Sequence, residues 1–261
     1  TFIKTSVLAT IASSSSYSFS RGLYDGKIIG HGDFKFKLDK KWSSQDVSKH
    51  PVDHCHEMVI DKNNKLYMTT THNKNNILVY SRDGKVLDSH NLNFPGAHGL
   101  TVFDEGGEEF LYVTDPDNNK FCKTTLKGKK IFELKAPREV SEYTSSSLFK
   151  PTEITVASNG DFYVADGYGL DFIIQYDSKG NYIRHFGGRG NNENQFDCCH
   201  GITVDTRDSN NPFLLITSRS KNEFKRFTMD SPVIEPLWMH SLYIVVPVIP
   251  SWYCSLTRIH I

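Results

Sequence analysis

A short sequence phrase that recurs four times constrains this chain more than any other feature. Each copy has a polar head residue followed at once by a β-prone apolar run. The four copies begin at His56, His98, Thr152 and His200. The intervals between these head residues are 42, 54 and 48 residues, close to the roughly 40–50 residues of a propeller blade. We therefore expect a repeat protein.

Each copy continues in the same way, with further apolar runs separated by turns. In the third copy the runs are residues 161–166, 172–176 and 182–186. The middle run alternates apolar and polar residues, which is typical of a half-buried strand. Gly84, Gly128 and their counterpart Gly180 are predicted to supply the positive φ of tight hairpins. Four strands per repeat predict an all-β chain that forms a β-propeller of four-stranded blades. About four blades can be recognised in the sequence.

The charge balance excludes one class of partner. The 261 residues contain 30 basic and 30 acidic residues with no basic run, so the sequence predicts no nucleic-acid partner. The hydrophobic content of 38% is sufficient for a packed core. We divide the ordered part into an N-terminal strand or linker at residues 21–50 and propeller blades at residues 51–230.

The two ends of the chain read differently from the repeats. Residues 1–20 combine a Phe-Ile-Lys start, an apolar run and a serine-rich stretch, and they resemble a twin-arginine export signal entered midway. This predicts an exported protein, periplasmic or extracellular; the alternative is a short buried or disordered apolar end. Residues 231–261 lack the repeat and are predicted to be an atypical tail, frame-shifted or truncated. His240 and two prolines argue against a stable membrane span there.

The head residues are the candidate site. Equivalent positions on the innermost strands of a propeller form a ring around its axis, so His56, His98 and His200 should face one another there, together with Thr152. Neutral imidazoles are good zinc ligands, and the pattern predicts a zinc site. Two alternatives stay open: histidines that hydrogen-bond only the backbone, and a structural calcium ion that stabilises the propeller.

The chain also resembles a known family at several of these motifs. The matching segments are residues 98–100, 112–115, 150–156, 164–168 and 200–202. They look like the blades of peptidyl-α-hydroxyglycine α-amidating lyases, members of the NHL-repeat class, and the match covers about residues 51–230. The resemblance implies a six-bladed propeller that holds zinc with three histidines on alternate blades. His98 and His200 fall on two of those blades.

The resemblance also implies catalytic residues. Tyr168 lies in the Asp-Gly-Tyr element and inherits the role of the base that takes the substrate hydroxyl proton. Arg219 matches an arginine near the reacting centre that holds the substrate carboxylate. The family's third histidine would fall beyond Asp230, where no residue of the tail matches it, so His56 is the candidate for a different triad.

These observations predict an exported, zinc-dependent, amidating-lyase-like enzyme. Its substrate would be a small hydroxylated or carboxylated molecule or peptide. The alternative is a non-catalytic NHL propeller that binds protein or glycan, because one fold can serve both purposes. The sequence does not specify an oligomeric state.

Overall fold

The computed structural model of the chain describes residues 28–37, 39 and 41–229. The predicted export signal at residues 1–20 and the predicted tail at residues 231–261 lie outside the described residues. Within the described ranges, no helix is long and apolar enough to cross a membrane.

The described residues divide into two units. The first contains a hairpin of β1 (Ile28–His31) and β2 (Phe34–Lys37), the chain as far as Ser44, and the turn Asp83–Lys85. Within it, the Ser44 N–H donates to the carbonyl of Gly84 at 3.0 Å. The second unit begins at Gln45, omits that turn, and contains all the remaining strands.

The second unit consists of four antiparallel sheets in which the strands follow one another in sequence order. The first sheet contains β3 (Cys55–Ile60), β4 (Leu66–Thr70), β5 (Ile77–Tyr80) and β6 (Val86–His90). The second contains β7 (Leu100–Glu105), β8 (Glu108–Asp115), β9 (Lys120–Thr125) and β10 (Lys130–Leu134). The third contains β11 (Glu153–Val156), β12 (Phe162–Ala165), β13 (Phe172–Tyr176) and β14 (Tyr182–Gly187). The fourth contains β15 (Ile202–Asp205), β16 (Phe213–Ser218) and β17 (Glu223–Thr228).

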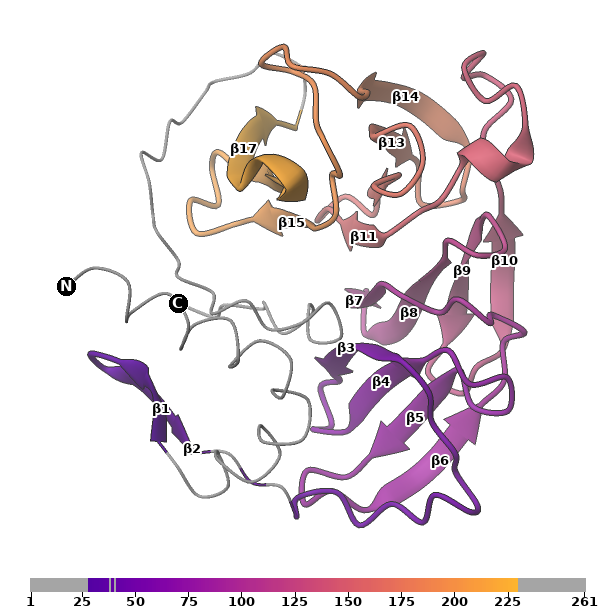
Figure 1. Ribbon diagram of the computed structural model, residues 1–261, viewed down its shortest axis with the longest axis vertical. Helices are drawn as coiled ribbons and strands as arrows, with labels where there is room; N and C mark the ends of the chain where they lie inside the picture. Colours follow the sequence, from indigo (N-terminus) through magenta and orange to yellow (C-terminus); the bar gives the residue numbers. More distant parts are fainter. Residues whose placement is uncertain (1–27, 38, 40, 230–261) are drawn as a thin grey trace, which may run out of the picture. The chain divides into compact units, whose positions relative to one another are not determined.

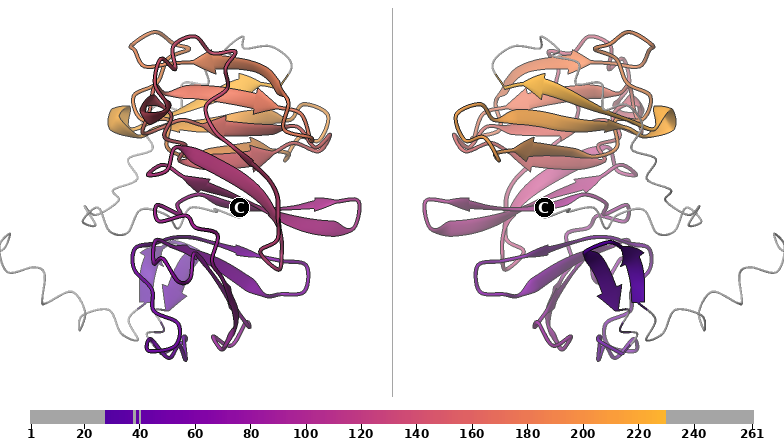
Figure 2. Two further views of the ribbon diagram at one scale, coloured as in Figure 1. Left: turned by 90° about the vertical axis from the view of Figure 1, so that its right-hand side faces the viewer. Right: turned by 90° about the vertical axis from the view of Figure 1, so that its left-hand side faces the viewer.

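These sheets are the blades of a propeller. The first strands of successive sheets contact each other, β3 with β7, β7 with β11, and β11 with β15. Figure 1 shows the four sheets succeeding one another in chain order, and the views in Figure 2 show them stacked. The prediction of an all-β propeller is therefore confirmed, with four blades within the described residues.

A separate hydrophobic core fills each blade interface. One cluster joins blades 1 and 2, a second joins blades 2 and 3, and a third joins blades 3 and 4. Strand β12 shows how a single strand serves two interfaces. Its Phe162 and Val164 belong to the core shared with blade 2, whereas Tyr163 and Ala165 belong to the core shared with blade 4. Successive side chains of a strand point to opposite faces, so both faces of a central blade are buried.

The sequence prediction of half-buried third strands was wrong for β5, β9 and β13, whereas β17 is half-buried, with one of its six residues buried and two partly buried. All four residues of β5 are buried, as are five of the six residues of β9. Several polar residues of these strands are buried with partners, although the buried hydroxyl of Thr124 in β9 has none among the described residues. Lys123, for example, is 5% exposed and its ammonium lies 2.6 Å from the Glu105 carboxylate. The prediction of positive φ in the hairpin turns is confirmed at Gly84 (85°), Gly128 (76°) and Gly180 (87°).

Candidate functional site

The four head residues lie at the starts of the innermost strands. His56 is within β3, at a register irregularity between Cys55 and Met58. His98 and His200 each precede their strand by two residues, and Thr152 directly precedes β11. Because these strands contact one another, the histidines converge. The ring centroids of His56 and His98 are 4.4 Å apart in a stacked arrangement, and those of His98 and His200 are 4.9 Å apart.

The backbone orients the imidazole of His98. Its Nδ1 lies 2.9 Å from the carbonyl oxygen of Thr152, and its main-chain N–H donates to the carbonyl of Thr114 at 2.9 Å. A carbonyl can only accept, so Nδ1 carries the proton and Nε2 keeps its lone pair. This arrangement, with one ring nitrogen fixed on a backbone carbonyl, is usual for histidines that bind metals. Thr152, the head residue that is not a histidine, thus orients the histidine of the preceding blade.

The hydroxyl of Tyr168 lies between two of the histidines. Tyr168 is in the loop between β12 and β13, and its Oη is 2.9 Å from His200 Nε2 and 3.3 Å from His98 Nε2. If His200 is the same tautomer as His98, one hydroxyl hydrogen serves two imidazole acceptors. A cation at the position of that hydrogen would be coordinated by the Nε2 lone pairs of both imidazoles.

Arg219 completes the group around this oxygen. It is the first residue of a short 3-10 helix (Arg219–Lys221) that follows β16 directly. Its main-chain N–H donates to the carbonyl of Cys198 at 2.9 Å, which anchors the helix beside His200. The guanidinium Nη1 donates to Tyr168 Oη at 3.3 Å, and the guanidinium carbon Cζ lies 5.2 Å from the centroid of the tyrosine ring. A positive charge beside Oη favours negative charge on that oxygen.

The electrostatic environment keeps the histidines neutral. Burial lowers the pKa of His98 to about 3 and that of His200 to about 2; the imidazole of His56 adds to the effect at His98, and that of His98 adds to it at His200. Burial also lowers the pKa of His56, and His54 adds to the effect. Three neutral imidazoles at neutral pH are chemically suited to bind a divalent transition metal.

The donor set fits zinc in its chemistry. His98 and His200 direct Nε2 atoms at a common oxygen, and the ring of His56 stacks on His98 with an angle of 27° between planes. Across the part of the chain that the structure describes, no group of three or more His, Cys, Asp or Glu side chains is arranged to hold a metal. The structure thus brings together every site residue predicted from the sequence, while their catalytic and metal-binding roles stay predictions.

Sequence reasoning missed one buried carboxylate next to Tyr168. Asp166 is fully buried and accepts three hydrogen bonds, from Lys150 N–H at 2.5 Å, Leu170 N–H at 2.7 Å and the Tyr143 hydroxyl at 2.8 Å. Burial raises the pKa of Asp166 to about 7, although these donors favour its ionised form. The only sequence signal was its place in the Asp-Gly-Tyr element, because its main partners lie in an irregular linker.

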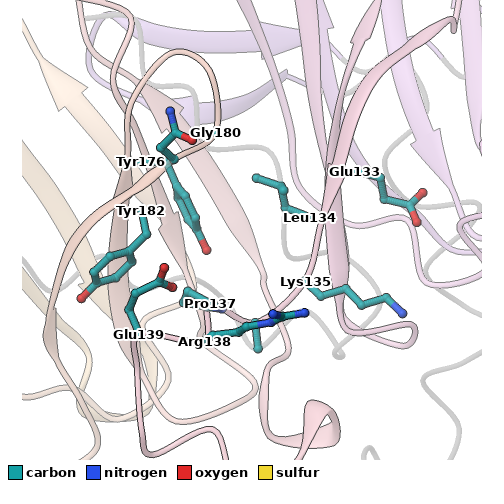
Figure 3. A pocket seen from close by; sticks show the side chains of 11 residues that line it. Glu133, Leu134, Lys135, Pro137, Arg138, Glu139, Tyr176, Gly180 and Tyr182 are labelled. Carbon is teal, nitrogen blue, oxygen red and sulfur yellow. The ribbon is translucent and has the colours of Figure 1, made fainter.

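A separate cavity of about 480 Å³ opens between blades 2 and 3 and shares no residue with the histidine group. It is bounded by the end of β10 with the linker that follows, and by Tyr176 and Tyr182 of the next blade (Figure 3). The buried hydroxyl of Tyr176 has no hydrogen-bond partner among the described residues. The size of the cavity is in the range of small-molecule pockets.

Comparison with known proteins agrees with the family resemblance. The chain is 35% identical over 112 residues to a probable peptidyl-alpha-hydroxyglycine alpha-amidating lyase of Caenorhabditis elegans, a match that covers 42% of this chain and 31% of that protein. It is 24% identical over 179 residues to NHL repeat-containing protein 3 of Mus musculus, covering 65% of this chain and 51% of that protein. No family model matches the chain.

Among solved structures, the chain is similar to a catalytically inactive variant of virginiamycin B lyase from Staphylococcus aureus. The TM-score is 0.49 at 16% sequence identity, and the match covers 75% of this chain and 56% of that one. The chain spans about a third to a half of the length of the curated relatives described above. The predicted resemblance to amidating lyases and NHL-repeat proteins is confirmed.

Proposed function

We propose that this chain carries active-site residues of an exported, zinc-dependent, amidating-lyase-like enzyme. The substrate would be a small hydroxylated and carboxylated molecule of the peptidyl-α-hydroxyglycine type. One observation carries the proposal: Tyr168 Oη of blade 3 lies within hydrogen-bonding distance of His98 Nε2 of blade 2 and of His200 Nε2 and Arg219 Nη1 of blade 4.

The proposed chemistry assigns a task to each side chain. Arg219, which donates a hydrogen bond to Tyr168 Oη, would bind the substrate carboxylate and favour the ionised phenol. Tyr168 would accept the proton of the substrate hydroxyl. The C–N bond then breaks as the hydroxyl oxygen becomes the carbonyl of glyoxylate, and the nitrogen takes a proton to leave a primary amide.

His98 and His200 would hold zinc through Nε2, with His56 as the candidate third ligand. When bound, zinc would act as a Lewis acid toward the substrate oxygen. The carbonyl of Thr152 would fix the ring of His98 and raise its basicity. A structural calcium ion stays a separate prediction. It is tested by removing all metal with a chelator, adding back zinc alone, and measuring whether the melting temperature is still lower than before chelation.

The first test measures zinc and product on the same samples. The folded chain is incubated with a synthetic peptidyl-α-hydroxyglycine, glyoxylate release is followed, and bound zinc is measured by elemental analysis. We expect about one zinc per chain, loss of zinc in His98→Ala and His200→Ala, and loss of turnover with zinc retained in Tyr168→Phe. His185→Ala, on the outer strand of blade 3 with its imidazole on the Tyr182 hydroxyl, is the matched control and should keep both.

Two results would overturn the proposal. A folded chain that binds no zinc and releases no glyoxylate would favour the protein- or glycan-binding propeller instead. Full turnover in Tyr168→Phe would remove the assigned base. Export is tested separately, by following where the protein accumulates when it is expressed with its natural N-terminal residues.

A further inference from the structure

Asp166 and Tyr143 form a latch between two segments that are far apart in the sequence. The carboxylate of Asp166 is fully buried, and its Oδ2 accepts from the Tyr143 hydroxyl at 2.8 Å. Tyr143 lies in the linker between blades 2 and 3, where its ring packs edge-on against Phe149 and Phe172 at centroid distances of 5.5 and 6.0 Å. The hydroxyl is therefore held in place by packing as well as by its hydrogen bond.

The same carboxylate fixes the loop that presents Tyr168. Asp166 accepts from Lys150 N–H on the linker and from Leu170 N–H on the far side of the loop. Its own carbonyl accepts from Gly169 and Asp171 N–H, both at 3.1 Å. The loop has little room to shift, because a Cβ at Gly169 would lie 2.2 Å from the Asp166 carboxylate and 2.2 Å from the carbonyl oxygen of Leu148.

The linker also holds Tyr168 directly. The Tyr168 N–H donates to the carbonyl of Lys150 at 3.3 Å. The N–H of the same Lys150 donates to the carboxylate of Asp166. Tyr168 and Asp166 are thus both hydrogen-bonded to the backbone of the same linker residue, Lys150. A displacement of the linker is transmitted to Tyr168 through one residue.

We propose that Asp166 and Tyr143 are positioning residues that set the hydroxyl of Tyr168 between His98 and His200. The inference rests on the proposed function for the role of Tyr168 in turnover, but the placement of its hydroxyl can be tested without turnover. Neither positioning residue contacts the histidines in the described hydrogen bonds, so each acts through the loop and not on the reacting atoms.

The chain contains a matched control for this latch. Asp61, 5% exposed, accepts from the Asn63 and Lys65 N–H groups and from the Tyr67 hydroxyl at 3.2 Å. It therefore makes the same three kinds of hydrogen bond as Asp166, but in the turn between β3 and β4. Its loss should destabilise blade 1 to a similar degree without moving the loop of Tyr168.

The experiment compares Tyr143→Phe and Asp166→Asn with the controls Tyr67→Phe and Asp61→Asn. The first readout is the ¹⁵N resonance of His200 Nε2 in the metal-free, histidine-labelled chain, which reports the hydrogen bond between His200 and Tyr168. Tyr168→Phe defines the signal when that bond is absent. The second readout is kcat and KM for glyoxylate release by the zinc-loaded chain.

We expect Tyr143→Phe to move the His200 signal part of the way toward that of Tyr168→Phe and to lower kcat about three- to tenfold with little change in KM. Asp166→Asn should have the larger effect, because its amide would face the Leu170 N–H with a donor. Tyr143→Phe keeps the ring packing, so it tests the latch even if Asp166→Asn fails to fold.

Two outcomes would overturn the inference: an unmoved His200 signal in Tyr143→Phe, or equal shifts in the controls. The second would show general loosening and no specific positioning. If the wild-type chain releases no glyoxylate, the proposed function fails, while the resonance of His200 still decides whether the latch places Tyr168.

Discussion

Acidification of the metal-free chain should destabilise it through two particular histidines. His98 and His200 have folded-state pKa values lowered to about 3 and about 2, mainly by burial, whereas an unfolded histidine titrates near pH 6.5. Both states are neutral about one pH unit or more above 6.5, so these histidines cost no stability there. As the pH falls below 6.5, the unfolded state binds protons that the folded state does not, and the free energy of unfolding decreases.

The size of the effect follows from the interval between the two pKa values. Between pH 7.5 and 5, each fully shielded histidine lowers the free energy of unfolding by about 2 kcal/mol, since one pKa unit corresponds to about 1.4 kcal/mol. His98 is buried, whereas His200 is only partly buried, so we reduce its share by about half. The pair should then remove about 3 kcal/mol, a large part of the roughly 5–15 kcal/mol typical of a domain.

The assay is urea unfolding, followed by tyrosine and tryptophan fluorescence, at pH 7.5 and pH 5 in the presence of a chelator. The reference is a double variant, His98→Gln with His200→Gln, which removes both titrating groups and retains polar side chains. For each chain we take the change in the free energy of unfolding between pH 7.5 and pH 5, and we compare these changes because the absolute stabilities of the two chains will differ. If the double variant loses as much stability on acidification as the wild-type chain, the two imidazoles are not the shielded groups described above.

Three further perturbations test the packing around the site and the blade interfaces. Phe162→Ala removes a fully buried ring that lies within 6 Å of Tyr112, Phe121, Phe132 and Tyr176; we expect a loss of about 3–5 kcal/mol in urea unfolding, and a loss under 1 kcal/mol would contradict the interface. Gly167→Ala would place a Cβ 2.7 Å from the carbonyl oxygen of Cys199; we expect a lowered melting temperature in calorimetry, with an unchanged value showing that the loop can move. Arg189→Gln removes the cation 2.8 Å from the fully buried Asp171; because the arginine is mostly exposed, we expect only about 1–2 kcal/mol in chemical denaturation, and a loss near zero would mean that the Cys199 N–H suffices for that carboxylate.

The sequence predicted the blades well because their signals are local and periodic. The intervals between head residues place the innermost strands, and Gly128 and Gly180 mark hairpin turns that need positive φ. Burial of three of the third strands, β5, β9 and β13, was misread because polar residues among them suggest a solvated face. Gln175 is buried nonetheless, since its amide donates to Asp161 and its carbonyl oxygen accepts from Arg184. Such pairing depends on neighbouring strands and leaves no periodic signal.

The site divides in the same way between predictable and unpredictable parts. Convergence of His56, His98 and His200 follows from their shared repeat position. The latch between Tyr143 and Asp166 does not, because it joins an irregular linker to a loop 23 residues away. The carbonyl of Thr152 is also invisible to sequence reasoning, since any residue type would supply it.

The hydrogen bond from His98 to the Thr152 carbonyl limits how this repeat architecture can be rearranged by gene duplication or deletion. Blade 2 depends, through its histidine, on the backbone of blade 3, so the working unit is larger than the repeat. Deleting blade 3 would place His200 and its own loop where that carbonyl stood. Blade 3 supplies both this carbonyl and the hydroxyl of Tyr168, so any recombination that kept the site would have to move blades 2 and 3 together.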